Sequence, residues 1–201
     1  MPKRKVEKNS RPGRLRIVAG NWRSRLLQIA AVPGLRPTSA RIRETLFNWL
    51  APRINGSRCL DLCAGTGALG IEALSRGATH CVFVEKSVPA VATLRANIEA
   101  LKASGTSVYA MDARDYLQQQ GVEPFDIVFL DPPFAAGMLP ELCRLLEHGT
   151  MLADNARVYV EEDRAAAACA YPASWKVLKT ANAGKVRYSL VDTGTRAART
   201  N

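Results

Sequence analysis

An apolar run that ends in two consecutive prolines constrains the fold of this chain more than any other feature. Residues 125–130 read Phe-Asp-Ile-Val-Phe-Leu, and Asp131-Pro132-Pro133-Phe134 follow directly. A short run rich in β-branched and aromatic residues is typical of a buried parallel strand. Because proline cannot donate a ladder hydrogen bond, the strand must stop at this point. The sequence therefore predicts a stiff turn at the carboxyl end of a buried strand, where open α/β sheets bind their ligands.

Strand-like and helix-like segments alternate along most of the chain. We expect strands at 58–62, 80–84, 107–110, 125–130 and 156–160. We expect helices from the glycine-rich turn that ends at Gly70 through Leu74 to Arg76, at 88–101, 115–120 and 139–147, and, as a short helix, around 165–170. A terminal hairpin at 175–180 and 185–191, linked by 182–184, closes the pattern. Alternation of this kind predicts an α/β fold: a seven-stranded, mostly parallel sheet with helices on both faces and an antiparallel C-terminal hairpin.

A glycine-rich turn joins the first predicted strand of the sheet to its helix. Gly65, Gly67 and Gly70 form a GxGxxG pattern, and Asp61 stands ahead of it. Glycines here permit a tight turn and let a ligand approach backbone N–H groups closely. The motif alone is shared with nicotinamide dehydrogenases. Because a carboxylate at Asp61 would repel a pyrophosphate but attract an ammonium group, we expect a ligand with a cationic amino acid moiety.

Acidic residues also follow the other predicted strands, as Glu85, Asp112 and Asp131. The carboxyl ends of parallel strands meet at one edge of a sheet, so we expect these acids to line one rim. A carboxylate at the end of the second strand suits ribose hydroxyls. At the fourth strand, Asp131 and a proline carbonyl can accept both hydrogens of an exocyclic amine while the Phe134 ring stacks on a planar base. The simpler alternative is a strand end with a proline stop and a core phenylalanine.

The positive charge of the chain is concentrated at its N-terminus. Up to Leu60 there are 14 Lys and Arg against two acids, and from Asp61 onward 14 against 16. This asymmetry favours a polyanion-binding module joined to a near-neutral domain, although a basic tail can also be merely solubilising. We expect a disordered basic arm at 1–13, a nucleic-acid-binding extension at 14–54, a main domain at 55–191 and a flexible tail at 192–201.

The predicted extension consists of a β-hairpin and a helix. Two β-like runs flank the link Gly20-Asn21, and a helix capped by Thr38 or Ser39 continues to Leu50. Arginines and a tryptophan on such a ribbon can meet phosphates and unpaired bases, while the alternative is an edge hairpin kept soluble by its charge. Ile42, Leu46, Trp49 and Leu50 form the apolar stripe by which the helix packs on the main domain.

The composition favours a cytoplasmic protein without membrane span, secretory signal or metal site. The longest apolar runs fall short of the roughly 18 residues that a membrane helix needs. Five cysteines, Cys59, Cys63, Cys81, Cys143 and Cys169, contain no CxxC pair and fit reduced thiols. His80 and His148 lack the spacing of metal ligands.

Taken together, Asp61, Gly65-Thr66-Gly67, Glu85, Asp112-Ala113 and the turn from Asp131 to Phe134 resemble the S-adenosylmethionine-dependent amino-methyltransferases, with their Rossmann-like fold. Four N-terminal segments make the resemblance more specific: Arg16-Ile17-Val18-Ala19-Gly20, Trp22-Arg23, Arg36-Pro37-Thr38 and 41–48. With them, the chain resembles the RsmD family, the bacterial 16S ribosomal RNA guanine-N2 methyltransferases, which modify G966 in assembled small subunits. Ala19 departs from the glycine that the family often carries, which puts only local hairpin packing in question.

The resemblance implies a role for each group of residues. Bound S-adenosyl-L-methionine would contact Asp61, Ala64, Gly65, Thr66, Gly67, Glu85, Lys86, Asp112 and Ala113. The catalytic turn would be Asp131, Pro132, Pro133 and Phe134. RNA contacts would come from Arg14, Arg16, Trp22, Arg23, Arg25, Arg36, Thr38 and Arg41. The partner would be 16S rRNA in the small ribosomal subunit, bound by a monomer that uses no metal.

Three alternatives stay open on the residues alone. Methyltransferases that act on adenine N6 or on protein glutamine commonly carry Asn-Pro-Pro-Tyr, so Asp131 and Phe134 count against them. A non-catalytic RNA-binding or ribosome-assembly factor would not need the intact glycine loop. An NAD(P) oxidoreductase would carry a hydride-transfer acid such as histidine or tyrosine after the fourth strand, where this chain has Asp131.

Overall fold

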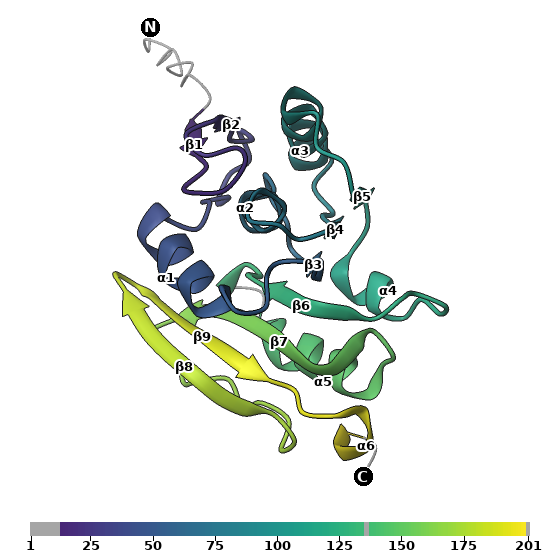
Figure 1. Cartoon of the computed structure of the whole chain (residues 1–201). Coiled ribbons are helices and arrows are strands. Elements are labelled where there is room, and N and C mark those ends of the chain that lie inside the picture. The colour runs from purple at the N-terminus through teal and green to yellow at the C-terminus, as the bar shows by residue number, and fades with distance from the viewer. Residues whose placement is uncertain (1–12, 135–136, 200–201) are drawn as a thin grey trace, which may run out of the picture.

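The computed structural model describes residues 13–134 and 137–199 of the chain (Figure 1). These residues contain a seven-stranded sheet of order β5-β4-β3-β6-β7-β9-β8. Its strands are β3 (Arg58–Asp61), β4 (His80–Val84), β5 (Thr106–Tyr109), β6 (Phe125–Leu130), β7 (Leu152–Asp163), β8 (Lys176–Ala183) and β9 (Val186–Asp192). β3 to β7 pair in parallel, and β9 is antiparallel to both of its neighbours. The expected Rossmann-like α/β fold with an antiparallel C-terminal hairpin is confirmed.

Helices cover both faces of the sheet (Figure 1). On one face, α1 (Ala40–Leu50), α2 (Ala68–Ser75) and α3 (Val88–Leu101) pack on strand residues such as Cys59, Phe83 and Phe129. On the other face, α4 (Ala113–Leu117) and α5 (Leu139–His148) pack on residues such as Leu60 and Val128. Successive strand residues point to opposite faces, so strands covered on both sides are apolar throughout. This is why the sheet reads as short continuous apolar runs in the sequence.

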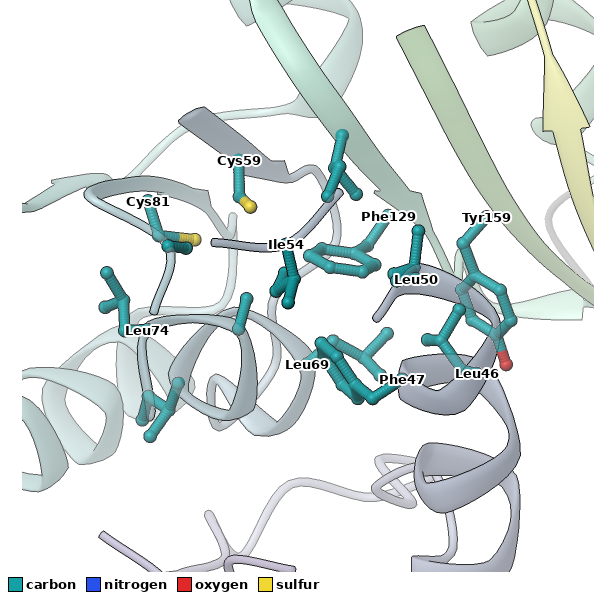
Figure 2. Packing of buried hydrophobic residues seen from close by; sticks show 14 of the residues in the cluster. Leu46, Phe47, Leu50, Ile54, Cys59, Leu69, Leu74, Cys81, Phe129 and Tyr159 are labelled. Atoms are coloured by element: carbon teal, nitrogen blue, oxygen red, sulfur yellow. The ribbon is translucent and has the colours of Figure 1, made fainter. Parts of the chain in front are cut away.

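The N-terminal hairpin, β1 (Arg14–Arg16) and β2 (Leu26–Gln28), shares its apolar core with the main sheet. Ile17 and Leu27 are buried in the same cluster as Leu46 and Leu50 of α1. Figure 2 shows these two α1 residues lying close to Phe129 and Tyr159 of the sheet. We therefore propose that the extension and the main domain are functional modules of one folded body.

A buried ion pair also holds the extension to the main domain. Arg43 of α1 and Glu72 of α2 are both fully buried, and their side chains are 2.8 Å apart. Glu72 also accepts hydrogen bonds from the backbone N–H groups of Val18 and Ala19, at 2.9 and 3.0 Å, and from Arg76. Arg43 in turn donates to the carbonyl oxygens of Arg16 and Thr38. One carboxylate and one guanidinium thus connect the hairpin, α1 and α2.

Four local expectations are wrong. The hairpin link is the longer segment 17–25, because Gly20 and Asn21 lie against the end of α2, where the Asn21 N–H donates to the Ser75 carbonyl at 2.7 Å. The alanine-rich run 165–170 has no helix, and its chain is held instead by hydrogen bonds such as that from the Cys169 N–H to Glu162. The C-terminal turn is the two residues Gly184 and Lys185 in place of 182–184, because β8 continues to Ala183. A short helix, α6 (Arg196–Arg199), forms in the tail that carries no core signal.

The part of the chain that the structure describes has neither a helix suited to span a membrane nor a cluster of metal-ligating side chains. No helix there is both long and apolar enough to cross a membrane. Nor does this part of the chain gather three or more histidine, cysteine or acidic side chains in a way that would hold a metal ion. The expected basic arm at 1–13 lies almost wholly outside the described residues.

Candidate active site

The carboxyl ends of five neighbouring strands bring acidic side chains to one edge of the sheet. Along the strand order, Asp112 follows β5, Glu85 follows β4, Asp61 ends β3 and Asp131 follows β6. Glu161 lies near the end of β7, beside Asp131, because the β6–β7 register pairs Leu130 with Val160. Parallel pairing alone produces this row, since it points every strand of the set in the same direction. The four acids that the sequence analysis selected therefore lie on one rim, and a fifth joins them.

The glycine loop occupies the rim between β3 and α2. Gly65 and Gly67 have φ of 53° and 82°, a left-handed backbone that other residues rarely adopt. A Cβ on Gly67 would also lie 2.4 Å from Leu94 Cδ1 of α3, so no side chain fits there. Within the loop, Thr66 is buried and its hydroxyl has no hydrogen-bond partner among the described residues. Such an orphaned polar atom is expected where a ligand completes the hydrogen bonding.

Glu85 is fixed beside the glycine loop by backbone hydrogen bonds. One carboxylate oxygen accepts from the Gly65 N–H at 2.9 Å, and the other accepts from the Ser87 N–H at 2.7 Å. Each oxygen of an ionised carboxylate has a further lone pair to offer, so the oriented group can still receive two hydroxyl donors. This geometry fits the predicted contact with a ribose.

Asp61 supports the loop from below. Asp61 is 3% exposed, and its Oδ2 accepts a hydrogen bond of 2.9 Å from the N–H of Gly70 in the first turn of α2. Burial, with smaller contributions from the charges of Glu85 and Glu161, raises the pKa of Asp61 to about 7, although the hydrogen bond from Gly70 lowers it. Asp61 thus anchors α2 to β3 as well as lying behind the loop.

Asp112 is held by a different set of partners. It caps α4 by accepting from the Arg114 N–H at 3.0 Å, and the Arg114 guanidinium bonds both of its oxygens. Lys86 lies 3.8 Å away. The hydrogen bonds from Arg114 lower the pKa of Asp112 to about 2, so this carboxylate is ionised at neutral pH. Ala113, the next residue of α4, is buried.

The turn after β6 runs from the interior to the surface of the protein. Asp131 is half-buried, Pro132 is buried, and Pro133 and Phe134 are exposed. Phe134 retains 42% of its surface, which leaves its ring free for a stacking partner. Because β6 pairs directly with β3, this turn and the glycine loop follow adjacent strands. The turn and the glycine loop therefore lie side by side at one edge of the sheet.

Asp131 belongs to a hydrogen-bonded group whose other members, Thr38, Tyr159 and Glu161, are buried. The Thr38 hydroxyl lies 3.2 Å from Asp131 Oδ2 and 2.7 Å from Glu161 Oε1, and the Tyr159 hydroxyl donates to the same Glu161 oxygen at 2.8 Å. Burial, the charge of Glu161 and that of Asp61 raise the pKa of Asp131 well above its usual range, although the hydrogen bond with Thr38 lowers it. Burial likewise raises the pKa of Glu161. The site therefore combines two carboxyl groups that resist full ionisation.

The basic residues of the extension lie at the surface. The arginines that we expect to contact RNA are all exposed, namely Arg14, Arg16, Arg23, Arg25, Arg36 and Arg41. Two of them are oriented by the fold, since Arg16 donates to the Ser24 carbonyl and Arg25 to the Ala100 carbonyl. Contact between these arginines and RNA stays a prediction, and their exposed side chains are accessible for it.

Two residues expected to contact RNA lie deeper than the sequence indicates. Thr38 is 5% exposed, and its hydroxyl faces Asp131 and Glu161. Trp22 is half-buried and packs against the core cluster beneath the hairpin. The helix cap explains the first case: Ser39 takes the N-cap position by accepting from the Ile42 N–H, which turns Thr38 inward.

Sequence reasoning left three functional neighbours unassigned. Glu161 carried a usable signal, because it too follows an apolar strand, but nothing in its spacing pairs it with Thr38. Arg114 stands two residues after Asp112, yet the same spacing occurs by chance in any charged segment. Tyr159 reads as an ordinary core aromatic until its hydroxyl is seen to reach Glu161 at 2.8 Å.

Comparison with known proteins matches most of the chain to one family. Residues 15–192 match the family described as Conserved hypothetical protein 95. The Ribosomal RNA small subunit methyltransferase D of Escherichia coli (strain K12) is 45% identical over 186 residues, which are 92% of this chain and 93% of that protein. The protein of the same description from Haemophilus influenzae is 40% identical and is covered to 98% of its length.

A solved structure agrees with this match. The putative methyltransferase yhhF from Escherichia coli superposes with a TM-score of 0.84 at 42% sequence identity, covering 91% of this chain and 99% of that one. The sheet, the helices on both faces and the N-terminal extension are therefore a shared architecture.

Proposed function

The chain belongs to the RsmD family of ribosomal RNA small subunit methyltransferases, and on this premise we propose that it methylates the exocyclic N2 of a guanine in 16S rRNA. The observation that carries the proposal is the placement of Asp131-Pro132-Pro133-Phe134 directly beside the glycine loop, on adjacent parallel strands. By family resemblance the target is G966 in the small ribosomal subunit, in the cytoplasm. The methyl donor is S-adenosyl-L-methionine.

The rim acids and the glycine loop fit that donor. Glu85 would hold the ribose hydroxyls, Asp112 with Ala113 would hold the adenine, and the Gly65-to-Gly67 loop would contact the amino acid end. The unpaired Thr66 hydroxyl and the oriented Glu85 carboxylate support this assignment, because both offer hydrogen-bonding capacity that the chain itself leaves unused. When bound, the cofactor supplies an electrophilic methyl group on a positively charged sulfur.

The turn after β6 prepares the nucleophile. The lone pair of guanine N2 is conjugated into the ring, which makes the amine weakly nucleophilic. Asp131 and the Pro132 carbonyl accept its two hydrogens from one side, and this favours a pyramidal nitrogen whose lone pair points away from them. Phe134 stacks on the base and fixes its plane. Alignment of this kind contributes on the order of 7–11 kcal/mol relative to free encounter.

Asp131 also receives the charge that the reaction creates. Transfer of a methyl group from the bound donor would leave the positive charge on N2. An ionised Asp131 stabilises that charge and takes the surplus proton, which restores a neutral secondary amine. Because a base inside a stack cannot reach such a group, the guanine must be unpaired or extruded.

The basic extension brings the RNA to this edge. Six exposed arginines lie on the hairpin, the turn that follows it and α1, in the same extension that carries Thr38. Their charge attracts phosphates without regard to sequence, and they orient the RNA backbone. Because Arg43 and Glu72 tie the extension to α2, phosphate contacts on the hairpin are held in fixed register with the glycine loop.

Radiolabel transfer tests the proposal. Small ribosomal subunits from a strain that lacks this gene are incubated with methyl-labelled S-adenosylmethionine and the purified protein. We expect about one methyl group per subunit, and initial incorporation at least about 100-fold slower with the Asp131→Ala variant. No incorporation by the wild-type chain, or equal incorporation by both proteins, would contradict the proposed function.

A further inference from the structure

Glu161 is a buried acid to which the proposed mechanism gives no role. It is 3% exposed and lies next to Asp131, because β7 runs parallel to β6. A buried carboxyl group is costly to ionise unless it is paired or hydrogen-bonded. Its hydrogen-bond partners are the hydroxyls of Tyr159 and Thr38, neither of which carries a positive charge. The position therefore needs an explanation beyond packing.

The count of protons explains how Glu161 and Asp131 are joined. Thr38 has one hydroxyl proton, yet its oxygen lies within hydrogen-bond distance of a carboxyl oxygen on each side, at 2.7 Å from Glu161 and 3.2 Å from Asp131. It can donate to only one of them. The other contact is a hydrogen bond only when that carboxyl group is protonated and donates to Thr38. Both contacts are satisfied when the two carboxyl groups share a single proton.

The surrounding charges favour the same count. The charge of Asp61, at the end of β3, acts on Asp131. The Tyr159 hydroxyl of β7 donates to Glu161 and is affected by the charges of both carboxyl groups, and the Tyr188 ring of β9 lies 6.3 Å from the Tyr159 ring, between centroids. Cys63, after β3, feels the charges of Asp61 and Asp131, and Asp61 feels those of Glu85 and Glu161. Each of these carboxyl, thiol and phenol groups is neutral when protonated and negative when deprotonated, so none of them offers a positive charge to the pair. Removing the last proton from the pair would therefore place two negative charges side by side in a buried site, which like-charge repulsion opposes.

We propose that Glu161 is a positioning residue that holds, through the Thr38 hydroxyl, the proton that Asp131 must give up to act on the target amine. This inference rests on the proposed function. In one arrangement Asp131 is protonated and donates to Thr38, which donates to Glu161. In the other, protonated Glu161 donates to Thr38, which donates to ionised Asp131, while Tyr159 donates to Glu161 in both.

The two arrangements interconvert by a short relay. The proton on Asp131 Oδ2 moves to Thr38 Oγ1 as the Thr38 proton moves to Glu161 Oε1, so the charge of the pair is unchanged. A positive charge near Asp131, from the methyl donor or from the methylated amine, favours the arrangement in which Asp131 is the anion. The pair thus provides an ionised Asp131 as the proton acceptor when a positive charge is nearby, because the proton moves to Glu161 and is not released to solvent.

Carbon-13 NMR titration of carboxyl-labelled protein without substrate shows directly whether Asp131 and Glu161 share a proton. In the wild-type chain we expect the two carboxyl groups to titrate as one coupled pair, in two steps at least about two pH units apart. In Glu161→Gln, whose amide imitates the protonated acid, Asp131 should titrate in one step at least about one pH unit lower. The acid limb of the pH–rate profile should shift to lower pH by the same amount. Independent single-step titrations in the wild type, or a Glu161→Gln profile identical to wild type, would overturn the inference.

Variants of the bridge and a matched control complete the test. Thr38→Val should lower the rate of methyl transfer at least tenfold, and Thr38→Ser, which keeps the hydroxyl, should restore most of it. Asp163→Asn makes the same acid-to-amide change two residues further along β7 and should leave the titration of Asp131 unmoved. A wild-type chain that shows the coupled titration but transfers no methyl group would refute the proposed function while leaving the shared proton established.

Discussion

Breaking the buried pair Arg43–Glu72 from one side should cost more stability than breaking an exposed ion pair such as Arg58–Glu123. The side chains of Arg43 and Glu72 are fully buried and lie 2.8 Å apart, and Glu72 receives four hydrogen bonds from the hairpin, α1 and α2. Glu72→Gln keeps the volume but leaves the Arg43 guanidinium buried without a counter-charge. Breaking a buried pair in this way costs about 3–5 kcal/mol. For a chain of this size, that lowers the melting temperature by about 6–20 °C.

Urea unfolding, followed by circular dichroism, measures this effect. The midpoint should fall while the slope stays the same, since the surface exposed on unfolding is unchanged. Glu123→Gln is the control: Glu123 pairs with Arg58 at 2.9 Å, but its side chain is 74% exposed, so its loss should cost less than about 1 kcal/mol. If Glu72→Gln costs no more than Glu123→Gln, the reasoning about burial is wrong.

Three further predictions concern the site and the extension. Asp131→Ala should lower methyl transfer by about 100-fold or more, while calorimetry shows nearly unchanged binding of S-adenosylmethionine; a rate like that of the wild type would refute the role of the carboxylate. Gly67→Ala should destabilise the protein and weaken cofactor binding, because its Cβ would lie 2.4 Å from Leu94 Cδ1 at a φ of 82°, and unchanged melting and affinity would contradict the packing argument. Replacing four hairpin arginines with alanine should weaken RNA binding and reduce the salt slope by up to about three, as a filter-binding series over salt concentration would show; an unchanged slope would mean that the hairpin makes no phosphate contacts. The four are Arg14, Arg16, Arg23 and Arg25.

The sheet and its rim could be predicted because they depend on local patterns. Apolar runs followed by a glycine, an acid or a proline mark where each parallel strand ends, and pairing then places Asp61, Glu85, Asp112 and Asp131 at one edge. The two prolines after Asp131 leave the chain no way to continue the strand. Each of these features is set by a few adjacent residues, so the sequence alone contains them.

The failures arise where distant segments decide the structure. Gly20-Asn21 is a strong turn signal, but the hairpin link lengthens because the Asn21 N–H bonds to the end of α2. The alanine-rich run at 165–170 has the propensity for a helix, yet Glu162 binds its backbone at Cys169 and Arg187 bonds the Ala166 carbonyl, which holds it as a loop.

The same reason applies to the site. Thr38 and Glu161 are separated by 123 positions in the chain, and no pattern in either neighbourhood announces their contact at 2.7 Å. The pairing of Arg43 with Glu72 is equally invisible, because a helical arginine and a helical glutamate are ordinarily surface residues. Contacts between remote side chains thus supply the part of the site that residue types and spacing do not reveal.

The central claim is that the turn from Asp131 to Phe134 presents the N2 amine of a guanine to a methyl donor held by the neighbouring glycine loop. Nucleoside mass mapping of 16S rRNA, from subunits of a deletion strain treated with the purified protein, tests it most directly. We predict N2-methylguanosine at one position, inferred to be G966, and unmodified guanine there before treatment. Methylation of adenine N6 or of a ring carbon, or no new methylated nucleoside at all, would contradict the account.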